Sequence, residues 1–273
     1  MIHDYSGSPE SELVALSDVI REIERITAVA TGSLFVVGAQ ARDLIHKSLG
    51  FVGALRSTSD IDIAIGLKDW SGFEDIRNAV PATGHTGMRF TIAGWPVDIL
   101  PFGEVERGVG KVFPPGRDQE FDVFGMQEAY GSSDELILPY GRPARMPSPA
   151  GYAALKIKSW VDRSPRPDTR DARDFTVALH WYQESPVLVE RLWYEQSELV
   201  LDSGSDQDLA AAAMLGIDIR TVLGGSRSIE LAQLWDEASR EKMAREMRDP
   251  QFAQSALAPR NRDVLDAVWW RLR

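Results

Sequence analysis

The sequence feature that most constrains the fold is the alternating segment at residues 58–65, Thr-Ser-Asp-Ile-Asp-Ile-Ala-Ile. A period of two predicts a β-strand, in which successive side chains point to opposite faces. Asp60 and Asp62 are therefore expected on one face, and the three isoleucines on the other face, in a core. Neighbouring carboxylates repel each other unless a positive charge lies near them. The acidic face is thus either an exposed face of an edge strand or a site for a divalent cation such as Mg²⁺, which prefers oxygen ligands.

The residues around this segment predict a mixture of helices and strands up to residue 146. Gly94 separates two strand patterns and predicts a hairpin, and Ser8 followed by Pro9 predicts the start of a helix. The pattern predicts strands at 34–37, 88–93, 95–100, 121–124 and 136–138, and helices at 39–46, 69–80 and 126–130. The glycine- and proline-rich residues 103–118 are expected to form a loop.

The pattern changes at Pro147, after which apolar residues recur at helical spacing towards the C-terminus. We predict helices at 149–162, 168–183, 186–200, 206–223, 227–247 and 260–272. The chain is therefore expected to have an α+β fold with two domains. Residues 1–146 would form a mixed sheet with flanking helices, and residues 147–273 would form a domain of helices alone.

Composition excludes several classes of function. The 273 residues include no cysteine, which excludes disulfides, thiolate metal sites and a cysteine nucleophile. A formal net charge of −11 argues against broad, non-specific binding of nucleic acid, although it allows a local basic patch. The N-terminus has no signal-peptide pattern, and no apolar run approaches the length of a membrane span. We therefore expect a cytoplasmic protein with no membrane partner.

Gly38 lies where a predicted strand turns into a predicted helix. Glycine allows a sharp turn and the close approach of a phosphate, and a helix N-terminus offers N–H groups and a positive dipole end to an anion. Arg42, one turn into the helix, could add a charged fork to the same phosphate. The alternative is an ordinary strand-to-helix turn with a solvated Arg42–Asp43 face.

Asp98 is the one acid in an otherwise apolar strand pattern at residues 95–100. A buried and unpaired carboxylate is costly, so Asp98 is expected to be exposed, paired or bound to metal. If this strand lies beside the strand of Asp60 and Asp62, the three acids converge. Three carboxylates on adjacent strands could bind two Mg²⁺ ions, which grip triphosphate oxygens and activate an attacking hydroxyl.

The helical half contains a further group of charged residues. Lys156 lies in one predicted helix, and Asp171 and Asp174 lie three residues apart in the next, on one helix face. The group is either an ion pair between helices or part of a phosphate-binding site.

Together these motifs resemble the DNA polymerase β-like nucleotidyltransferases, and more narrowly the AbiEii/AbiGii toxin-type nucleotidyltransferases. The first motif of that group, Gly-x-x-x-Arg-Asp, is similar to the segment from Gly38 to Asp43, and the second, Asp-x-Asp, to Asp60 and Asp62. The third, a helix lysine, and the fourth, Asp-x-x-Asp, fall on Lys156 and on residues 171–174. Residues 97–102 are similar to a related set of predicted bacterial nucleotidyltransferases. The resemblance covers residues 34 to about 182.

The resemblance implies a fold and a role for each matching residue. The fold would be a polymerase β-like core followed by a helical domain, and an NTP would be the substrate. Asp60, Asp62 and Asp98 would bind two Mg²⁺ ions, with Asp98 as third ligand or general base. The triphosphate would be held by Gly38, Ala39 and Arg42, with Lys156 neutralising its charge, and Asp171 and Asp174 would position Lys156 or the acceptor. Many relatives have glycine or serine in place of Ala39, which offers only its backbone N–H.

These residues lead to a principal hypothesis and two alternatives. The principal one is an Mg²⁺-dependent nucleotidyltransferase that moves a nucleoside monophosphate to a hydroxyl on tRNA, a protein or a small molecule. Such an enzyme could be the toxin of a toxin–antitoxin pair, with a cognate antitoxin as partner. The first alternative is an antibiotic nucleotidyltransferase, because an acidic protein suits a cationic aminoglycoside. The second is a nucleotide-binding regulatory protein without catalysis. Residues 183–273 carry no assigned role.

Overall fold

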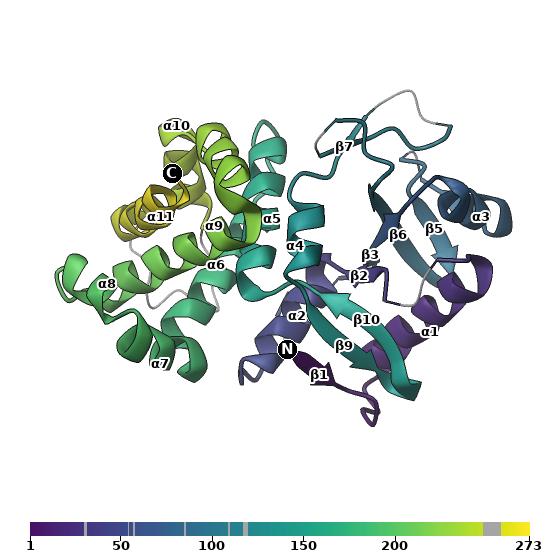
Figure 1. Cartoon of the computed structure of the whole chain (residues 1–273), viewed down its shortest axis with the longest axis horizontal. Coiled ribbons are helices and arrows are strands. Elements are labelled where there is room, and N and C mark those ends of the chain that lie inside the picture. Colours follow the sequence, from purple (N-terminus) through teal and green to yellow (C-terminus); the bar gives the residue numbers. More distant parts are fainter. Residues whose placement is uncertain are drawn as a thin grey trace. The chain divides into compact units, whose positions relative to one another are not determined.

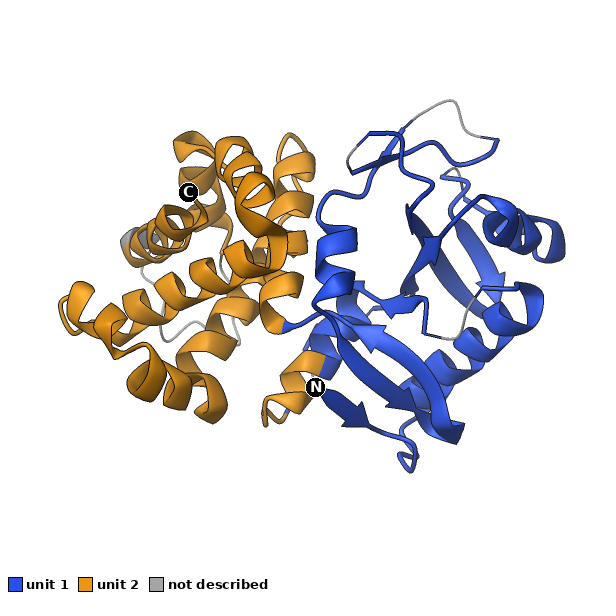
Figure 2. Ribbon diagram, viewed as in Figure 1, with its two compact units in different colours: residues 1–44, 53–148 blue, residues 45–52, 149–273 orange. Residues whose placement is uncertain are grey.

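The computed structural model describes residues 1–29, 32–53, 55–56, 58–84, 86–108, 110–116, 120–247 and 258–273. The chain forms two compact units (Figures 1 and 2). Unit 1 comprises residues 1–44 and 53–148, and unit 2 comprises residues 45–52 and 149–273. The fold is α+β, with a mixed sheet in unit 1 and helices in unit 2. The segment 45–52 belongs to unit 2, although the sequence places it within the first domain.

Unit 1 contains an eight-stranded mixed sheet within its described residues, in the order β1-β9-β10-β2-β3-β6-β5-β4. The strands are β1 (Ile2–Asp4), β2 (Leu34–Val36), β3 (Ile61–Leu67), β4 (Ala82–Thr83), β5 (Arg89–Ile92), β6 (Trp95–Gly103), β9 (Asp134–Leu138) and β10 (Arg142–Met146). A separate ribbon pairs β7 (Lys111–Val112) with β8 (Phe121–Asp122), inside and just after the predicted loop. The sequence pattern does not predict β1, β4, β7 or β10, because these strands are short and none alternates clearly between apolar and polar residues.

Helices cover both faces of this sheet (Figure 1). They are α1 (Ser11–Ile26), α2 (Gly38–Ser48), α3 (Ser71–Ala79) and α4 (Met126–Gly131). Phe73 of α3 packs edge-on against Phe90 of β5, and Tyr130 of α4 contacts Phe102 of β6. Phe90 and Phe102 point to opposite faces of the sheet, because Phe90 lies opposite Val97 and the alternation along β6 turns Phe102 the other way. Helices α3 and α4 therefore lie on different faces.

The acidic strand is present, but it begins later than predicted. β3 starts at Ile61, and its burial pattern places Ile61, Ile63 and Ile65 in the core, as expected. Asp60 lies directly before the first paired residue of the strand, and its carboxylate accepts a hydrogen bond of 2.5 Å from the Thr58 hydroxyl. The prediction that both aspartates lie within one strand is therefore wrong for Asp60.

The predicted hairpin at Gly94 is confirmed. β5 and β6 are antiparallel and are joined by Ala93 and Gly94, which have φ angles of 50° and 82°. Positive φ at both central residues is the geometry of a tight hairpin turn, and it fits the right-handed twist of the strands. A two-residue turn fixes which residues of β5 and β6 lie opposite each other.

Unit 2 is built of helices packed around large aromatic side chains. Its helices beyond residue 148 are α5 (Pro149–Arg163), α6 (Arg170–Glu184), α7 (Pro186–Glu195), α8 (Ser197–Asp202), α9 (Gln207–Leu234), α10 (Glu237–Glu246) and α11 (Ala258–Leu272). Trp160, Trp181 and Trp235 are almost fully buried, and Phe175 packs edge-on against Trp235. The sequence thus predicted the helical character of this region correctly.

Some predicted helix limits are wrong. α1 begins at Ser11 after Glu10, so Ser8 is not the residue that precedes its first turn. The predicted helix 186–200 is interrupted at Gln196. The predicted helix 227–247 ends at Leu234, and Asp236 then caps α10 by accepting a hydrogen bond from the N–H of Ser239. Of these limits, only the start of α10 has a side-chain cap, which the apolar pattern does not reveal, whereas Glu10 and Gln196 make no capping hydrogen bond through their side chains.

Helix α9 is long and apolar enough to meet a length and composition test for a membrane span, although the sequence predicted no such run. Half of the most apolar 18-residue stretch of this helix is buried in the protein, as expected for the core helix of a globular unit. Gly224, with φ 72° and ψ 164°, interrupts the helical conformation within α9. The break predicted at Gly224 is therefore confirmed.

Gly216 of α9 provides a test of this packing. A Cβ atom at Gly216 would lie 2.4 Å from the carbonyl oxygen of Val268 in α11, whereas one at Gly225 would meet no atom within 4 Å. We expect Gly216→Ala to lower the free energy of unfolding by about 1–3 kcal/mol, because backbone atoms must move. The matched control Gly225→Ala should leave it nearly unchanged or raise it slightly. Urea titrations followed by circular dichroism would measure both, and equal values would contradict the close approach.

Candidate active site

The site is organised by the parallel pairing of β3 with β6. Asp62 lies directly opposite Asp98 in this register. Residues opposite each other in a parallel pair point to the same face, so both carboxylates lie on the face opposite to the buried isoleucines of β3. The condition that the strand of Asp98 lies beside the acidic strand is therefore met, and it brings Asp62 and Asp98 together. Two residues far apart in the sequence are thereby brought together.

Arg89 of β5 connects Asp60 to Asp98. Its Nη2 lies 2.6 Å from Oδ2 of Asp60 and 2.6 Å from Oδ2 of Asp98, and its Nε lies 2.8 Å from Oδ1 of Asp98. The guanidinium therefore binds Asp98 with two parallel hydrogen bonds and Asp60 with a third, the strong geometry for such pairs. All three side chains are partly exposed, so molecules in solution can reach them.

These contacts change the acidity of the groups. Burial raises the pKa of Asp60, but the Thr58 hydroxyl and the charge of Arg89 outweigh it, so that the pKa lies below its ordinary value. The hydrogen bonds to Asp98 hold the pKa of Arg89 above its ordinary value. Both shifts favour the ion pair of Asp60 with Arg89, in which the carboxyl group is negative and the guanidinium positive.

Sequence reasoning missed Arg89, although a signal was present. The two-residue turn at Ala93 and Gly94 places Ile92 opposite Trp95, and counting outwards from this pair places Arg89 opposite Asp98. Opposite charges facing each other across an antiparallel pair stabilise it. The hairpin register alone would therefore have identified Arg89 as the partner of Asp98.

Gly38 lies against the carboxylate of Asp62. Gly38 has φ +64°, and a Cβ atom built on it would lie 1.9 Å from Oδ2 of Asp62. Only glycine avoids both the strained conformation and this clash. Gly38 is also the first residue of α2, and the first turn of a helix leaves N–H groups without intrahelical partners. The turn therefore places a positive helix end beside an acid of the site.

Two further residues of α2 connect this turn to Asp60. Gln40 donates a hydrogen bond of 2.9 Å from its amide to the carbonyl oxygen of Asp60, which fixes the backbone just before β3. Its Oε1 is buried and has no hydrogen-bond partner among the described residues. Ala39 is buried, so its methyl group packs inside, and only its backbone N–H could serve a ligand, as the resemblance implied.

Arg42 has a different position from the one expected of a phosphate ligand. Its side chain is 1% exposed, and its Nη2 donates a hydrogen bond of 2.6 Å to the carbonyl oxygen of Arg56, while its Nε contacts Asp43. The predicted direct contact with a triphosphate is therefore not available to Arg42 in this structure. Both alternatives in the sequence analysis placed Arg42 at the surface. Instead it supports the loop that leads to Asp60.

Lys156, Asp171 and Asp174 come together in unit 2. The Nζ of Lys156 lies 3.1 Å from Oδ1 of Asp171 and 2.7 Å from Oδ2 of Asp174, and Arg163 contacts the other oxygen of Asp171. Burial by itself lowers the pKa of Lys156, but Tyr152 and the two carboxylates raise it above its ordinary value. Both aspartates are almost fully buried. The geometry is that of an ion pair between α5 and α6, one of the two alternatives the sequence left open.

The acids of unit 1 suit a hard divalent cation in their chemistry. Oxygens of Asp60 and Asp98 already converge on one cationic nitrogen atom, and carboxylate oxygens are the ligands that Mg²⁺ prefers. At Gly38 the carboxylate of Asp62 occupies the space that a side chain would fill. Among the described residues, no three His, Cys, Asp or Glu side chains are already arranged as a complete metal site. A cation would therefore bind with rearrangement of these carboxylates.

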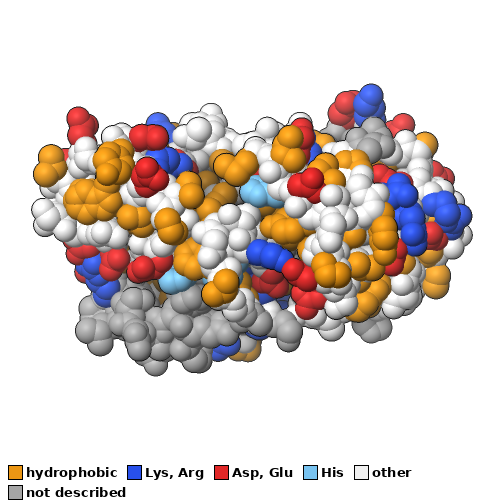
Figure 3. Space-filling view, turned by 90° about the horizontal axis from the view of Figure 1, so that it is seen from below, with side chains coloured by type: hydrophobic (Ala, Val, Ile, Leu, Met, Phe, Trp, Pro, Cys, Tyr) orange, Lys and Arg blue, Asp and Glu red, His pale blue; other side chains and the backbone are white. Residues whose placement is uncertain are grey.

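The surface gives no sign of a concentrated basic region on the face shown in Figure 3. Its visible lysine and arginine side chains are interspersed with aspartate and glutamate and with apolar residues. Since the net charge is −11, the charge distribution does not favour non-specific nucleic-acid binding.

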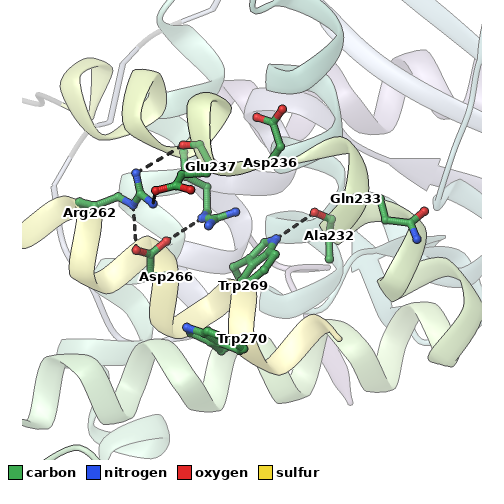
Figure 4. A pocket seen from close by; sticks show the side chains of 9 residues that line it. Ala232, Gln233, Asp236, Glu237, Arg262, Asp266, Trp269 and Trp270 are labelled. Atoms are coloured by element: carbon green, nitrogen blue, oxygen red, sulfur yellow. Dashed lines mark hydrogen bonds and ion pairs between the residues drawn. The ribbon is translucent and has the colours of Figure 1, made fainter.

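A cavity of about 460 Å³ lies elsewhere, in unit 2, and none of the predicted site residues lines it (Figure 4). Asp266 lies between Arg240 and Arg262 with contacts of 2.6 and 2.8 Å, and Trp269 donates a hydrogen bond to a backbone carbonyl. The charged groups of this cavity thus satisfy one another. We therefore place the candidate site at the partly exposed acids of unit 1.

The comparisons with known proteins give no relatives: no protein-family model, curated protein or solved structure matches the chain.

The Gly38 turn can be tested with a second glycine of positive φ. We expect Gly38→Ala to lower the free energy of unfolding by about 1 kcal/mol for its conformation and by a further 1–3 kcal/mol, roughly, for the clash with Asp62. Gly32 has φ +87°, and an added Cβ would meet no atom within 4 Å, so Gly32→Ala should show only the conformational loss of stability. Adding Asp62→Ala to Gly38→Ala should recover part of the loss. If the two glycine variants lost the same stability in urea, the close contact would be refuted.

The role of Lys156 can be tested through stability. Lys156→Met leaves Asp174 buried without its cation, and we expect a loss of about 3–5 kcal/mol in the free energy of unfolding. The double variant Lys156→Met/Asp174→Asn, which removes the uncompensated charge, should regain a substantial part of this loss. Denaturant unfolding of the full chain measures both values. Unchanged stability of Lys156→Met would show that the ion pair is not structural.

Proposed function

We propose that the protein is an Mg²⁺-dependent nucleotidyltransferase that transfers a nucleoside monophosphate from an NTP to a hydroxyl acceptor. The observation that carries this proposal is the position of Asp62 opposite Asp98 and against the glycine turn at Gly38, with Asp60 joined to Asp98 through Arg89. The resemblance of these motifs to polymerase β-like nucleotidyltransferases gives the same assignment.

The chain's own residues would divide the work. Asp60, Asp62 and Asp98 would hold Mg²⁺, which supplies charge neutralisation at the triphosphate and lowers the pKa of the attacking hydroxyl. The N–H groups at Gly38 and Ala39 would receive phosphate oxygens at the positive end of α2. Lys156, with Asp171 and Asp174, acts through the stability of unit 2 rather than as an available phosphate ligand, because its ammonium is already paired with both carboxylates.

The proposed transfer is balanced without any further reactant. The acceptor oxygen forms a bond to the α-phosphorus, and the bond from that phosphorus to the oxygen bridging to the β-phosphate breaks, so that pyrophosphate leaves. The proton of the acceptor hydroxyl passes to a carboxylate, for which Asp98 is the candidate. Catalysis of this kind depends mainly on positioning and charge stabilisation, which a rigid pair of strands can provide.

The acceptor is proposed as a class. A hydroxyl on tRNA, on a protein or on a small molecule fits the same chemistry, and a toxin with an antitoxin partner in the cytoplasm fits the resemblance. The interspersed charges and the net charge of −11 suit a cationic small molecule such as an aminoglycoside at least as well as RNA.

One observation favours a second candidate, a nucleotide-binding regulatory protein without catalysis. Arg89 already supplies positive charge to Asp60 and Asp98, so these acids are stable without metal. A test must therefore show turnover and not only binding.

The decisive variant is Asp62→Asn, which removes a charge and almost no volume. We expect it to lower transfer of label from α-³²P-labelled NTPs by at least about 100-fold in the presence of Mg²⁺, because a carboxylate ligand is lost. The acceptor pools would be total tRNA, cell protein and aminoglycosides. Glu22→Gln, on the exposed surface of α1, serves as the charge-matched control and should retain activity. Equal transfer by Asp62→Asn and the wild type would refute the catalytic assignment, and no transfer to any pool by the wild type would support the regulatory candidate.

A further inference from the structure

We propose that Arg89 competes with a divalent cation for Asp60 and Asp98, and that the displaced guanidinium then binds the phosphates of the nucleotide. This inference rests on the proposed function, since it concerns how the same acids exchange one positive partner for another. It assigns to Arg89 a part in ligand binding that the sequence motifs do not contain.

The competition follows from the atoms that Arg89 uses. Its hydrogen bonds reach Oδ2 of Asp60 and both carboxylate oxygens of Asp98, at 2.6 to 2.8 Å. Mg²⁺ binds carboxylate oxygens at about 2.0–2.1 Å and demands nearly octahedral geometry. Each of these oxygens has a second lone pair, but a cation bound to them would lie close to the guanidinium, and the two positive charges would repel each other. Binding of a cation by both acids is therefore expected to displace Arg89.

Arg89 can leave without disturbing the sheet. Its backbone is held in β5 by the pairing with β6, whereas its side chain is 38% exposed and extends over the acids. A long arginine side chain can rotate about its own bonds while the strand stays in place. The rearrangement is thus local, and among the described residues it costs the side-chain hydrogen bonds to the two acids.

The guanidinium that leaves has a natural second partner. A planar guanidinium matches the geometry of carboxylate and of phosphate equally well, with two parallel hydrogen bonds in each case. After a divalent cation has replaced it, Arg89 adds positive charge beside a site that has itself become more positive. An anionic triphosphate would relieve this repulsion. Metal and nucleotide are therefore expected to bind cooperatively, and metal alone to bind weakly.

The competition between Arg89 and a cation can be tested without any turnover. Binding of Mn²⁺ is measured through the loss of the electron paramagnetic resonance signal of the free ion. In the absence of nucleotide, we expect Arg89→Gln to bind Mn²⁺ about tenfold more tightly than the wild type, because the competing cation is gone. Arg89→Lys, which keeps the charge but lacks the planar fork, should lie between the two. Arg25→Gln removes an exposed arginine paired with Glu22 on α1, and it should match the wild type.

Binding of a non-hydrolysable NTP analogue with Ca²⁺, measured by calorimetry, tests the second half of the inference. Arg89→Gln should bind the analogue about tenfold more weakly than the wild type and Arg25→Gln, because a phosphate contact is lost. Circular dichroism melts would show that the variants are folded, and Arg89→Lys carries the test if Arg89→Gln is not.

The outcomes separate this inference from the proposed function. If Arg89→Gln bound Mn²⁺ no more tightly than the wild type, while Asp62→Asn weakened Mn²⁺ binding, the metal site would stand and the competition would be refuted. If neither the wild type nor any of the variants bound Mn²⁺, with or without the analogue, the proposed function itself would fail, and the inference with it. Tighter Mn²⁺ binding combined with unchanged binding of the analogue would refute the transfer of Arg89 to phosphate.

Discussion

The parallel pairing of β3 with β6 is the interaction on which the candidate site depends. It places Asp62 opposite Asp98 and directs both carboxylates to one face of the sheet. The isoleucines of β3 fix this register, because a shift of one residue would turn the apolar side chains out of the core and the acids into it. The free energy of burying Ile61, Ile63 and Ile65 thus holds two like charges together. Packing on one face of the strand thereby creates the chemistry on the other.

Charge balance then decides what surrounds the acids. In unit 1, Arg89 approaches Asp60 and Asp98 from the neighbouring strand, and all three groups remain partly exposed. In unit 2, Lys156 meets Asp174, which is almost fully buried. Both arrangements relieve repulsion between carboxylates, but the exposed one is open to ligands from solution, whereas the buried one is expected to lose stability if a partner is removed. Exposure therefore separates the candidate site from a structural ion pair.

The first turn of α2 supports the acids through the backbone. Gly38 leaves space for the carboxylate of Asp62, and Gln40 binds the carbonyl oxygen of Asp60. Arg42 holds the preceding loop through the carbonyl oxygen of Arg56. These three contacts come from one helical turn, which explains why a short glycine motif and a distant acidic motif belong to the same site. A motif residue can thus serve the site without touching a ligand.

The sequence by itself determined the alternating strand, the hairpin at Gly94, the helical character of the second half and the positions of the acids, because local periodicity and turn chemistry encode these features. The tertiary structure alone decided that Asp98 lies beside Asp62, that Arg89 also reaches Asp60 and that Arg42 points inwards. It also began the paired strand at Ile61, one residue after Asp60. The physical reason is that a periodic pattern specifies which face a side chain takes, whereas its partners depend on which elements meet in space.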